Sequence, residues 1–145
     1  MTYAMSEALQ TAVYQRLVSD PEVSDLTRGA VFDSVPDPAP DLFVALGPEK
    51  VRNRSDNTGP GASHEFRVSV VTRRQGYLAA KLVAACISDA MIKTTLTLSR
   101  GSVVFLRFIR AEARRDEGEG TRRIDLWFQA RLADHTTEQR IRNFE

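Results

Sequence analysis

The chain has 145 residues, which is the size of a single domain that can bury a hydrophobic core. Hydrophobic residues make up 42% and charged residues 27% of the sequence, which excludes a disordered chain of low hydrophobicity. The formal net charge of +1 lacks the basic excess typical of nucleic-acid-binding proteins, although it leaves room for a local basic patch.

Cys86 is the one cysteine, so the chain forms no internal disulfide and no cysteine-based metal cluster, as expected of a protein in a reducing compartment. No apolar stretch approaches the length of a membrane span. The first seven residues lack the basic and apolar regions of a signal peptide. We therefore expect synthesis in the cytoplasm and no membrane partner.

The first predicted element is a helix over residues 6–19. Ser6 is the expected N-cap, and Leu9, Val13 and Leu17 recur at helical spacing. The dipeptide Asp20-Pro21 is expected to end this helix.

Three strands are predicted next. Residues 30–35 form a short edge strand that ends in the proline-rich segment 36–40, and residues 41–46 form a second strand that can resume toward Arg52. Residues 53–63 are predicted as a long loop. Residues 64–73 alternate as a strand with one polar face.

The second predicted helix covers residues 75–92. Its apolar stripe contains Ala79, Val83, Cys86, Ile87 and Ala90, and Leu82 is expected to widen it. This position predicts that Cys86 is a small core residue rather than a nucleophile.

Two long strands, 103–115 and 121–132, are predicted to form an antiparallel hairpin around a turn at 116–120. The first is apolar on both faces at its start, which predicts that it begins in the core and ends by projecting beyond it. The second places Ile124, Leu126 and Phe128 inward and Asp125 and Trp127 outward.

This order of elements predicts an α+β fold: an antiparallel or mixed sheet with two helices on one face and a long C-terminal β-hairpin. We expect one domain over residues 1–133, followed by a polar tail over residues 134–145.

The sequence contains little evidence for a catalytic site. Nothing places a serine, cysteine or carboxylate partner beside His64 or His135, so a catalytic triad is not indicated. Asp33, Asp37 and Asp41 are evenly spaced but straddle prolines, which favours turn chemistry over a metal site. We expect no enzyme activity, no cofactor and no metal.

The terminal hairpin carries interleaved arginines and carboxylates around Trp127. Such a mixed-sign surface suits contacts between identical subunits, and an exposed tryptophan beside arginine is typical of interface anchors. The alternative is a solvated sheet face. The candidate interface residues are Arg110, Glu112, Arg114, Arg115, Arg123, Asp125, Trp127, Gln129 and Arg131.

The loop 53–63 and the tail are candidates for segments that become ordered on assembly. Within the loop the candidate residues are Arg54, Asp56 and Asn57.

Taken together, these pieces resemble the phage tail-terminator, or tail-completion, proteins, whose relatives occur in gene transfer agents. The resemblance covers nearly the whole chain. It rests on Ala8, Leu9, Gln10, Ala12, Val13, Tyr14, Leu17, Val31, Phe32, Asp33, Val35, Pro36, Phe43, Val44, Leu46, Gly47, His64, Val68, Val70, Arg73, residues 79–90, Arg115, Asp116, Gly118, Thr121, Phe128, Gln129 and Ala130.

The resemblance implies a structural virion protein made in the bacterial cytoplasm. It implies a ring, commonly a hexamer, that ends the tail tube at the head–tail junction. Its partners would be further copies of itself, the major tail-tube protein and a head–tail connector protein. DNA would pass only transiently through the lumen, and no cofactor is implied.

Two other hypotheses about the function remain. The chain could be another small head–tail connector or minor tail protein of similar length. It could also be a ligand-binding α+β domain or an enzyme, which would need polar residues that converge in a pocket.

Overall fold

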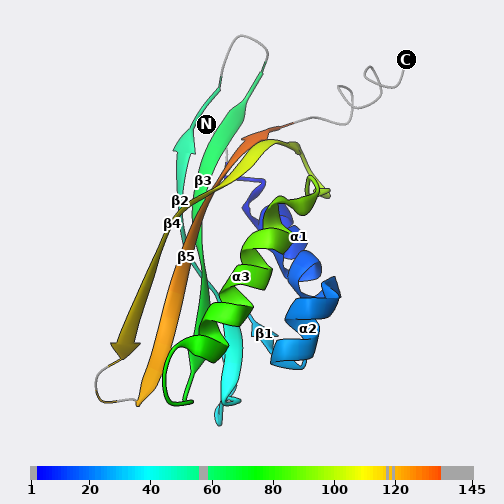
Figure 1. Ribbon diagram of the computed structural model, residues 1–145. Coiled ribbons are helices and arrows are strands. Elements are labelled where there is room, and N and C mark those ends of the chain that lie inside the picture. The colour runs from blue at the N-terminus through cyan, green and yellow to red at the C-terminus, as the bar shows by residue number, and fades with distance from the viewer. Residues whose placement is uncertain (1–2, 56–58, 117, 119, 135–145) are drawn as a thin grey trace.

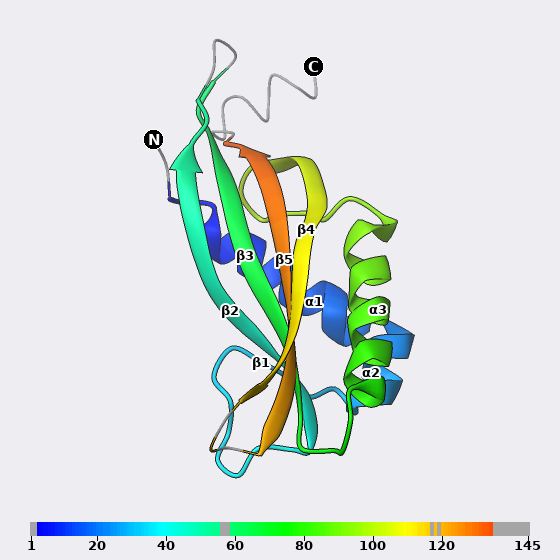
Figure 2. The same cartoon turned by 60° about the vertical axis from the view of Figure 1, so that its left-hand side comes forward.

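The computed structural model describes residues 3–55, 59–116, 118 and 120–134. A long, twisted five-stranded sheet forms one layer, and the helices pack together on one of its faces (Figures 1 and 2). The elements in chain order are α1 (Ser6–Ser19), α2 (Pro21–Thr27), β1 (Val31–Phe32), β2 (Leu42–Asn53), β3 (Gly61–Thr72), α3 (Leu78–Lys93), β4 (Ser102–Asp116) and β5 (Thr121–Ala133).

The strand order β1-β2-β3-β5-β4 places β1 and β4 at opposite edges of the sheet. β1 runs parallel to β2, while all other neighbours are antiparallel, so the sheet is mixed. The predicted α+β class, the edge position of the first strand and the C-terminal hairpin are confirmed.

The start of the chain differs from the prediction in two details. Helix α1 begins at Ser6 with Met5 as N-cap, so Ser6 is not the capping residue. Asp20 ends α1 but also caps α2, a helix that the sequence reading missed: its carboxylate accepts hydrogen bonds from the backbone N–H groups of Glu22 and Val23. Pro21 fits the first turn, where no backbone donor is needed.

The predicted loop 53–63 is shorter than expected because β2 and β3 extend into it. β2 continues past an irregularity between Leu46 and Glu49 and pairs with β3 as far as Asn53 opposite Ala62. The resulting hairpin projects at one end of the sheet (Figure 1). The sequence 53–63 has no apolar period because its strand residues are small or polar, although Ala62 is buried in the core.

Helix α3 begins at Leu78 rather than at residue 75 and buries a stripe formed by Ala80, Val83, Ala84, Ile87, Ala90 and Met91. Leu82 is 52% exposed, so its predicted place on the stripe is wrong. It lies on the solvent side of the helix. Arg16 of α1 donates to the carbonyl oxygens of Ala90 and Thr94, which joins the two helices at the end of α3.

Strand β4 is exposed along most of its length, so the prediction that it starts in the core is wrong. It has a neighbour on one side only, and its register with β5 shifts twice, between Val103 and Phe105 and between Phe108 and Arg110. Its apolar residues therefore mark an uncovered edge rather than a buried strand.

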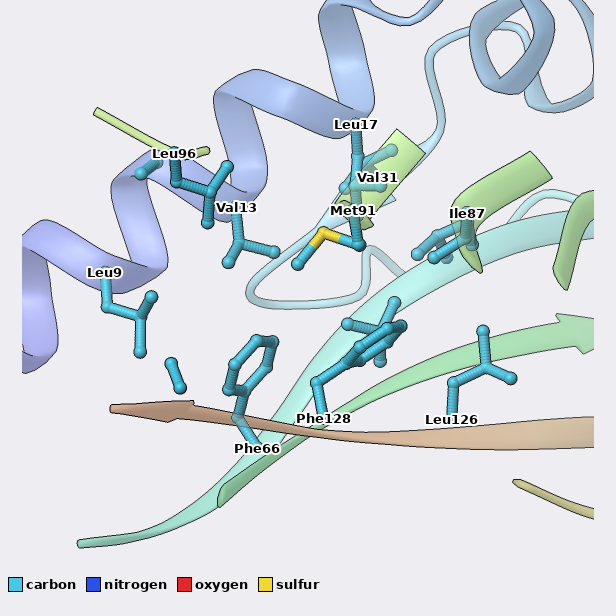
Figure 3. Packing of buried hydrophobic residues seen from close by; sticks show 14 of the residues in the cluster. Leu9, Val13, Leu17, Val31, Phe66, Ile87, Met91, Leu96, Leu126 and Phe128 are labelled. Atoms are coloured by element: carbon cyan, nitrogen blue, oxygen red, sulfur yellow. The ribbon is translucent and has the colours of Figure 1, made fainter. Parts of the chain in front are cut away.

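The core lies between the sheet and the helices. Leu9, Val13 and Leu17 of α1 and Met91 of α3 point toward the sheet, where Phe66 and Phe128 meet them (Figure 3). The rings of Phe66 and Phe128 are stacked at a centroid distance of 5.7 Å. The helices thus cover one side of the sheet except along the exposed edge strand β4.

Asp134, the first residue of the predicted polar tail, is buried and accepts two hydrogen bonds of 3.0 Å from the Arg100 guanidinium. The rest of that tail lies outside the described residues. Among the helices that the structure describes, none is long and apolar enough to cross a membrane.

Gly101 directly precedes β4 and lies close to Met5 and Ala133, and its replacement by alanine is expected to cost at least about 2 kcal/mol. The residue has a φ of +76°, and an added Cβ would lie 2.4 Å from the Met5 sulfur and 2.7 Å from the Ala133 carbonyl oxygen. Gly29→Ala is the matched control, because Gly29 has a φ of +75° with open space around it. Urea denaturation of both variants separates the clash from the backbone strain. Equal losses would mean that the contact at Gly101 relaxes freely.

Candidate subunit interface on the outer face of the sheet

The outer face is the side of the sheet that points away from the helices. On β5 it carries Arg123, Asp125, Trp127, Gln129 and Arg131, which alternate with buried residues such as Phe128. The β4 residues opposite them complete the face: Arg110 pairs with Trp127, Glu112 with Asp125, and Arg114 with Arg123. Eight of the nine predicted interface residues therefore share one face.

Arg115 is the exception. It follows Arg114 along β4 and pairs with Arg122, so strand alternation places it on the side of the helices. Its side chain is exposed at the sheet edge. It can contribute to a contact at the edge but not to the outer face.

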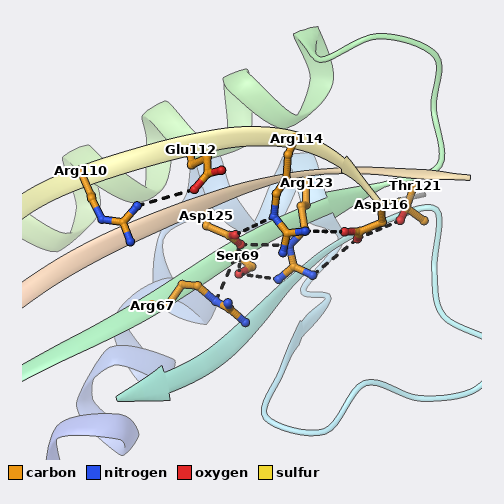
Figure 4. A network of polar contacts seen from close by, with 9 residues as sticks. All are labelled: Arg67, Ser69, Arg110, Glu112, Arg114, Asp116, Thr121, Arg123 and Asp125. Carbon is orange, nitrogen blue, oxygen red and sulfur yellow. Dashed lines mark hydrogen bonds and ion pairs between the residues drawn. The ribbon is translucent and has the colours of Figure 1, made fainter. Parts of the chain in front are cut away.

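Asp125 is the centre of an ion-pair network on this face (Figure 4). Although the residue is only 4% exposed, its carboxylate lies 3.0 Å from Arg123 Nε, 3.5 Å from Arg114 Nε and 3.8 Å from Arg67 Nε. It also accepts a 2.6 Å hydrogen bond from the Ser69 hydroxyl. One buried carboxylate thus joins β3, β4 and β5.

Burial by itself would raise the pKa of Asp125. The Ser69 hydrogen bond and the Arg123 and Arg67 guanidinium groups outweigh burial, so the pKa lies below its ordinary value. The carboxylate is therefore charged at neutral pH, and the network is intact.

Asp116 extends the network to the end of the hairpin. It lies 3.1 Å from Arg114 Nη1 and 3.5 Å from Arg123 Nη1, and it accepts a hydrogen bond from the Thr121 hydroxyl. Arg114 and Arg123 therefore each bridge the two carboxylates.

Trp127 lies between two guanidinium groups, with Arg110 at 5.0 Å and Arg67 at 5.8 Å from its ring centroid. The side chain is half-buried, so its predicted outward position is confirmed, but it is partly covered rather than free. Cation–π contacts of this kind hold the ring and both arginines in place.

Gln129 and Arg131 belong to the other end of the face. Gln129 accepts two hydrogen bonds from Arg107 and donates one to Ser63. Arg131 donates to the carbonyl oxygen of Arg54, which is the one described residue among the loop candidates. Asp56 and Asn57 lie outside the described residues.

The site also contains Arg67, Ser69 and Asp116, which were not predicted from the sequence. The alternation of residues 64–73 does place Arg67 and Ser69 on the polar side, but their role depends on β3 pairing with β5 rather than with β4. That pairing brings Ser69 opposite Asp125 and Arg67 opposite Trp127.

His64 does have a carboxylate partner, contrary to the sequence reading. It is fully buried, and its Nδ1 lies 3.3 Å from Glu49, because β2 resumes after the irregularity that follows Leu46 and pairs with β3 there. Glu49 also accepts hydrogen bonds from the Tyr3 and Ser6 hydroxyls. Burial would raise the pKa of Glu49, but the Ser6, Tyr3 and His64 contacts lower it overall.

This cluster ties the start of α1 to the sheet rather than forming a catalytic triad, since Ser6 donates to the carboxylate and not to the imidazole. An adjacent hollow of about 430 Å³ is lined by Gln10, Leu46 and Glu49 among others, but not by His64. Within the described part of the chain, no group of three or more His, Cys, Asp or Glu residues could hold a metal ion.

Cys86 is half-buried against the core, with its sulfur 3.6 Å from a Glu22 carboxylate oxygen. Burial and this carboxylate raise the pKa of the thiol. Little thiolate is therefore present at neutral pH, which agrees with a structural role.

Comparison with known proteins identifies the family of this chain. Its residues 11–133 match the sequence pattern of the family described as "Tail completion protein gp17". A search of curated proteins finds no match. A chain of the solved structure described as "Virion of native gene transfer agent (GTA) particle" is 49% identical, with a TM-score of 0.84, over 91% of this chain and 99% of that one. Because the family pattern spans most of the sequence, the chain belongs to the tail completion protein gp17 family.

Proposed function

We propose that this chain is a structural tail protein of a phage-like virion and that its copies form a hexameric ring. The ring would end the tail tube at its head-proximal end and join it to the head connector. Family membership and the 49% identity to a virion component support the structural role. The same evidence favours a non-enzymatic protein.

The exposed β4 edge is the observation that carries self-assembly. Val104, Phe105, Phe108 and Ile109 are each between 37% and 61% exposed on this one strand. A long apolar edge strand is normally covered, because it offers a template for pairing with another chain. A neighbouring subunit would cover it, with the adjoining Trp127 and its arginines as part of the contact.

The partners of the ring would be the major tail-tube protein on one side and a head–tail connector protein on the other. DNA would pass only transiently through the lumen. Each subunit would act as a single domain over residues 1–133. The mature location would be the head–tail junction of the particle, after synthesis in the bacterial cytoplasm.

Trp127→Ala is expected to weaken ring assembly by about 30-fold or more, since buried tryptophan anchors contribute about 2 kcal/mol or more to interfaces. The reason is that both guanidinium contacts to the ring are lost together with its apolar area. Sedimentation velocity over a concentration series measures the effect. Trp127→Phe, which keeps an aromatic ring, is the control and should retain most of the assembly. If a well-folded Trp127→Ala protein formed rings as the wild type does, the outer face around Trp127 would not be part of the subunit interface.

Reconstitution with the tail-tube protein tests the position of the ring. A tail terminator should halt tube growth and be seen by electron microscopy at one end only. A minor tail protein or a connector would leave tube length unchanged, which is the alternative that this experiment would favour.

A further inference from the structure

The two edges of the sheet carry opposite charge. β4 contains four arginines and two carboxylates, whereas residues 21–41, which run through α2, β1 and the loop after it, contain five carboxylates and one cation. We define the basic flank as the exposed residues Arg107, Arg110, Arg114 and Arg115. The acidic flank consists of the exposed residues Glu22, Asp25, Asp33, Asp37 and Asp41.

The charges of the four aspartates of the acidic flank form no ion pair inside the described part of the subunit, whereas Glu22 accepts a hydrogen bond from the Cys86 thiol. Asp25, Asp33, Asp37 and Asp41 are exposed, and within the described ranges no ion pair involves any of them. Turn chemistry explains why aspartate suits this proline-rich segment, but a turn needs no accumulation of one sign. The segment is therefore a predominantly negative surface, in which Arg28 is the one cation, and the backbone N–H of Arg73 donates to the Asp41 carbonyl oxygen beside it.

The two flanks lie at the same level of the sheet. Leu42, next to Asp41, pairs with Thr72, Thr72 pairs with Arg122, and Arg122 pairs with Arg115. Figure 1 shows β1 and the end of β4 on opposite sides of the sheet at the same end of the molecule. A second copy set edge to edge needs no shift along the strands to bring the flanks together.

Phe32, which precedes Asp33, falls in the row that runs through Ala45, Ser69 and Asp125 to Glu112. The two residues of β1 are thus level with Glu112 and Ala113 of β4. Asp33 and Asp41 of the acidic flank and Arg114 and Arg115 of the basic flank lie in or beside these rows.

Apolar side chains accompany the charges on both flanks. Phe108 and Ile109 lie beside the arginines of β4, and the acidic flank exposes Leu26 (39%) and Val35 (41%). Interfaces commonly combine an apolar centre with a charged rim, in which the charges select the partner and its orientation.

We propose that the basic flank of one copy docks on the acidic flank of the next copy, head to tail. The inference rests on the proposed ring and names the second half of its interface. A contact between two different surfaces of identical chains repeats in one rotational sense, and it forms a ring when the rotation between neighbours closes on itself. The aspartates of the proline-rich loop then bind the arginines of the neighbouring subunit.

Charge reversal on each flank separately tests the pairing. The basic-reversed variant carries Arg110→Glu with Arg115→Glu, and the acid-reversed variant carries Asp33→Lys with Asp41→Lys. Each alone is expected to need at least about tenfold more protein to assemble, because like charges then face each other. Arg114 is left intact, since it holds the Asp125 network.

Mixing the two variants gives the decisive result. In an equimolar mixture the reversed residues of one variant meet oppositely charged reversed residues of the other, but only when the two variants alternate around the ring. Native mass spectrometry with one variant isotopically labelled should show rings with equal numbers of each. The variant with all four reversals should assemble alone.

A matched control reverses two exposed carboxylates on the helices, Glu7→Lys with Asp89→Lys, and should assemble as the wild type does. Normal assembly of the acid-reversed variant, or failure of the mixture to form rings, would overturn the pairing of the flanks. Ring formation by the wild type would still support the proposed function in that case. A wild-type chain that neither assembles nor caps tail tubes would overturn the ring itself and this pairing with it.

Discussion

Replacing Phe128 by alanine is expected to lower the free energy of unfolding by about 3–5 kcal/mol. The ring is fully buried on the interior strand β5, stacked on Phe66 and edge-on to Phe108 at 6.0 Å. Its removal leaves a cavity beneath the helices that the surrounding strands cannot close. Urea denaturation at a fixed protein concentration measures the loss, and the concentration is fixed because assembly itself stabilises the fold.

Phe105→Ala is the matched control for Phe128. Phe105 is 37% exposed on the β4 edge, so its truncation should cost the isolated subunit about 1 kcal/mol or less. Equal losses for the two variants would mean that the described core does not hold the fold. A larger effect of Phe105→Ala on assembly than on unfolding would agree with the proposed use of this edge.

Asp125→Asn is expected to cost about 2–3 kcal/mol at neutral pH, below the full cost of breaking a buried ion pair because its arginine partners remain partly exposed. The amide leaves Arg67, Arg114 and Arg123 close together without the carboxylate that neutralises them. The loss in stability should be visible in the urea midpoint at pH 7.

The pH dependence of this loss follows from the lowered pKa of Asp125. A carboxyl group whose pKa is lower in the folded than in the unfolded chain stabilises the fold above the unfolded value, about 3.9. This stabilisation disappears as the pH falls through the folded value. The difference between the wild type and Asp125→Asn should therefore narrow below about pH 4.

Glu112→Gln is the control for this experiment. Its side chain is 58% exposed and forms one 3.7 Å ion pair with Arg110, so its removal should change stability little at any pH. A gap between the wild type and Asp125→Asn that stays constant down to pH 3 would show that the charge of Asp125 does not stabilise the fold.

Much of the fold could be predicted from the sequence, because burial on one side of a strand imposes a visible alternation. Residues 121–132 alternate cleanly, and every inward and outward assignment made for Ile124, Asp125, Leu126, Trp127 and Phe128 is confirmed. The polar face of the terminal hairpin follows from the same pattern.

Other features depend on contacts between distant segments. The apolar start of β4 reads like a buried strand, and only the strand order shows that it lies at an edge. Helix α2 was missed because Asp20-Pro21 both ends one helix and starts another. The acidic flank is visible in the sequence as evenly spaced aspartates. Its position opposite the arginines of β4 could not be predicted, because it depends on the order and register of five strands.

The unequal edges of the sheet also bear on misassembly. A long free strand such as β4 can nucleate fibres if an equally long strand accepts it. The opposite edge offers only the two residues of β1, and beyond it β2 carries an irregularity with Pro48 and then Lys50. Proline, irregular pairing and lysine all discourage backbone pairing. Among the described strands, this edge is therefore a poor partner for β4 of another copy, which disfavours edge-to-edge pairing into an endless filament. Contact between subunits is then left to side chains, whose shape and charge can specify a closed assembly.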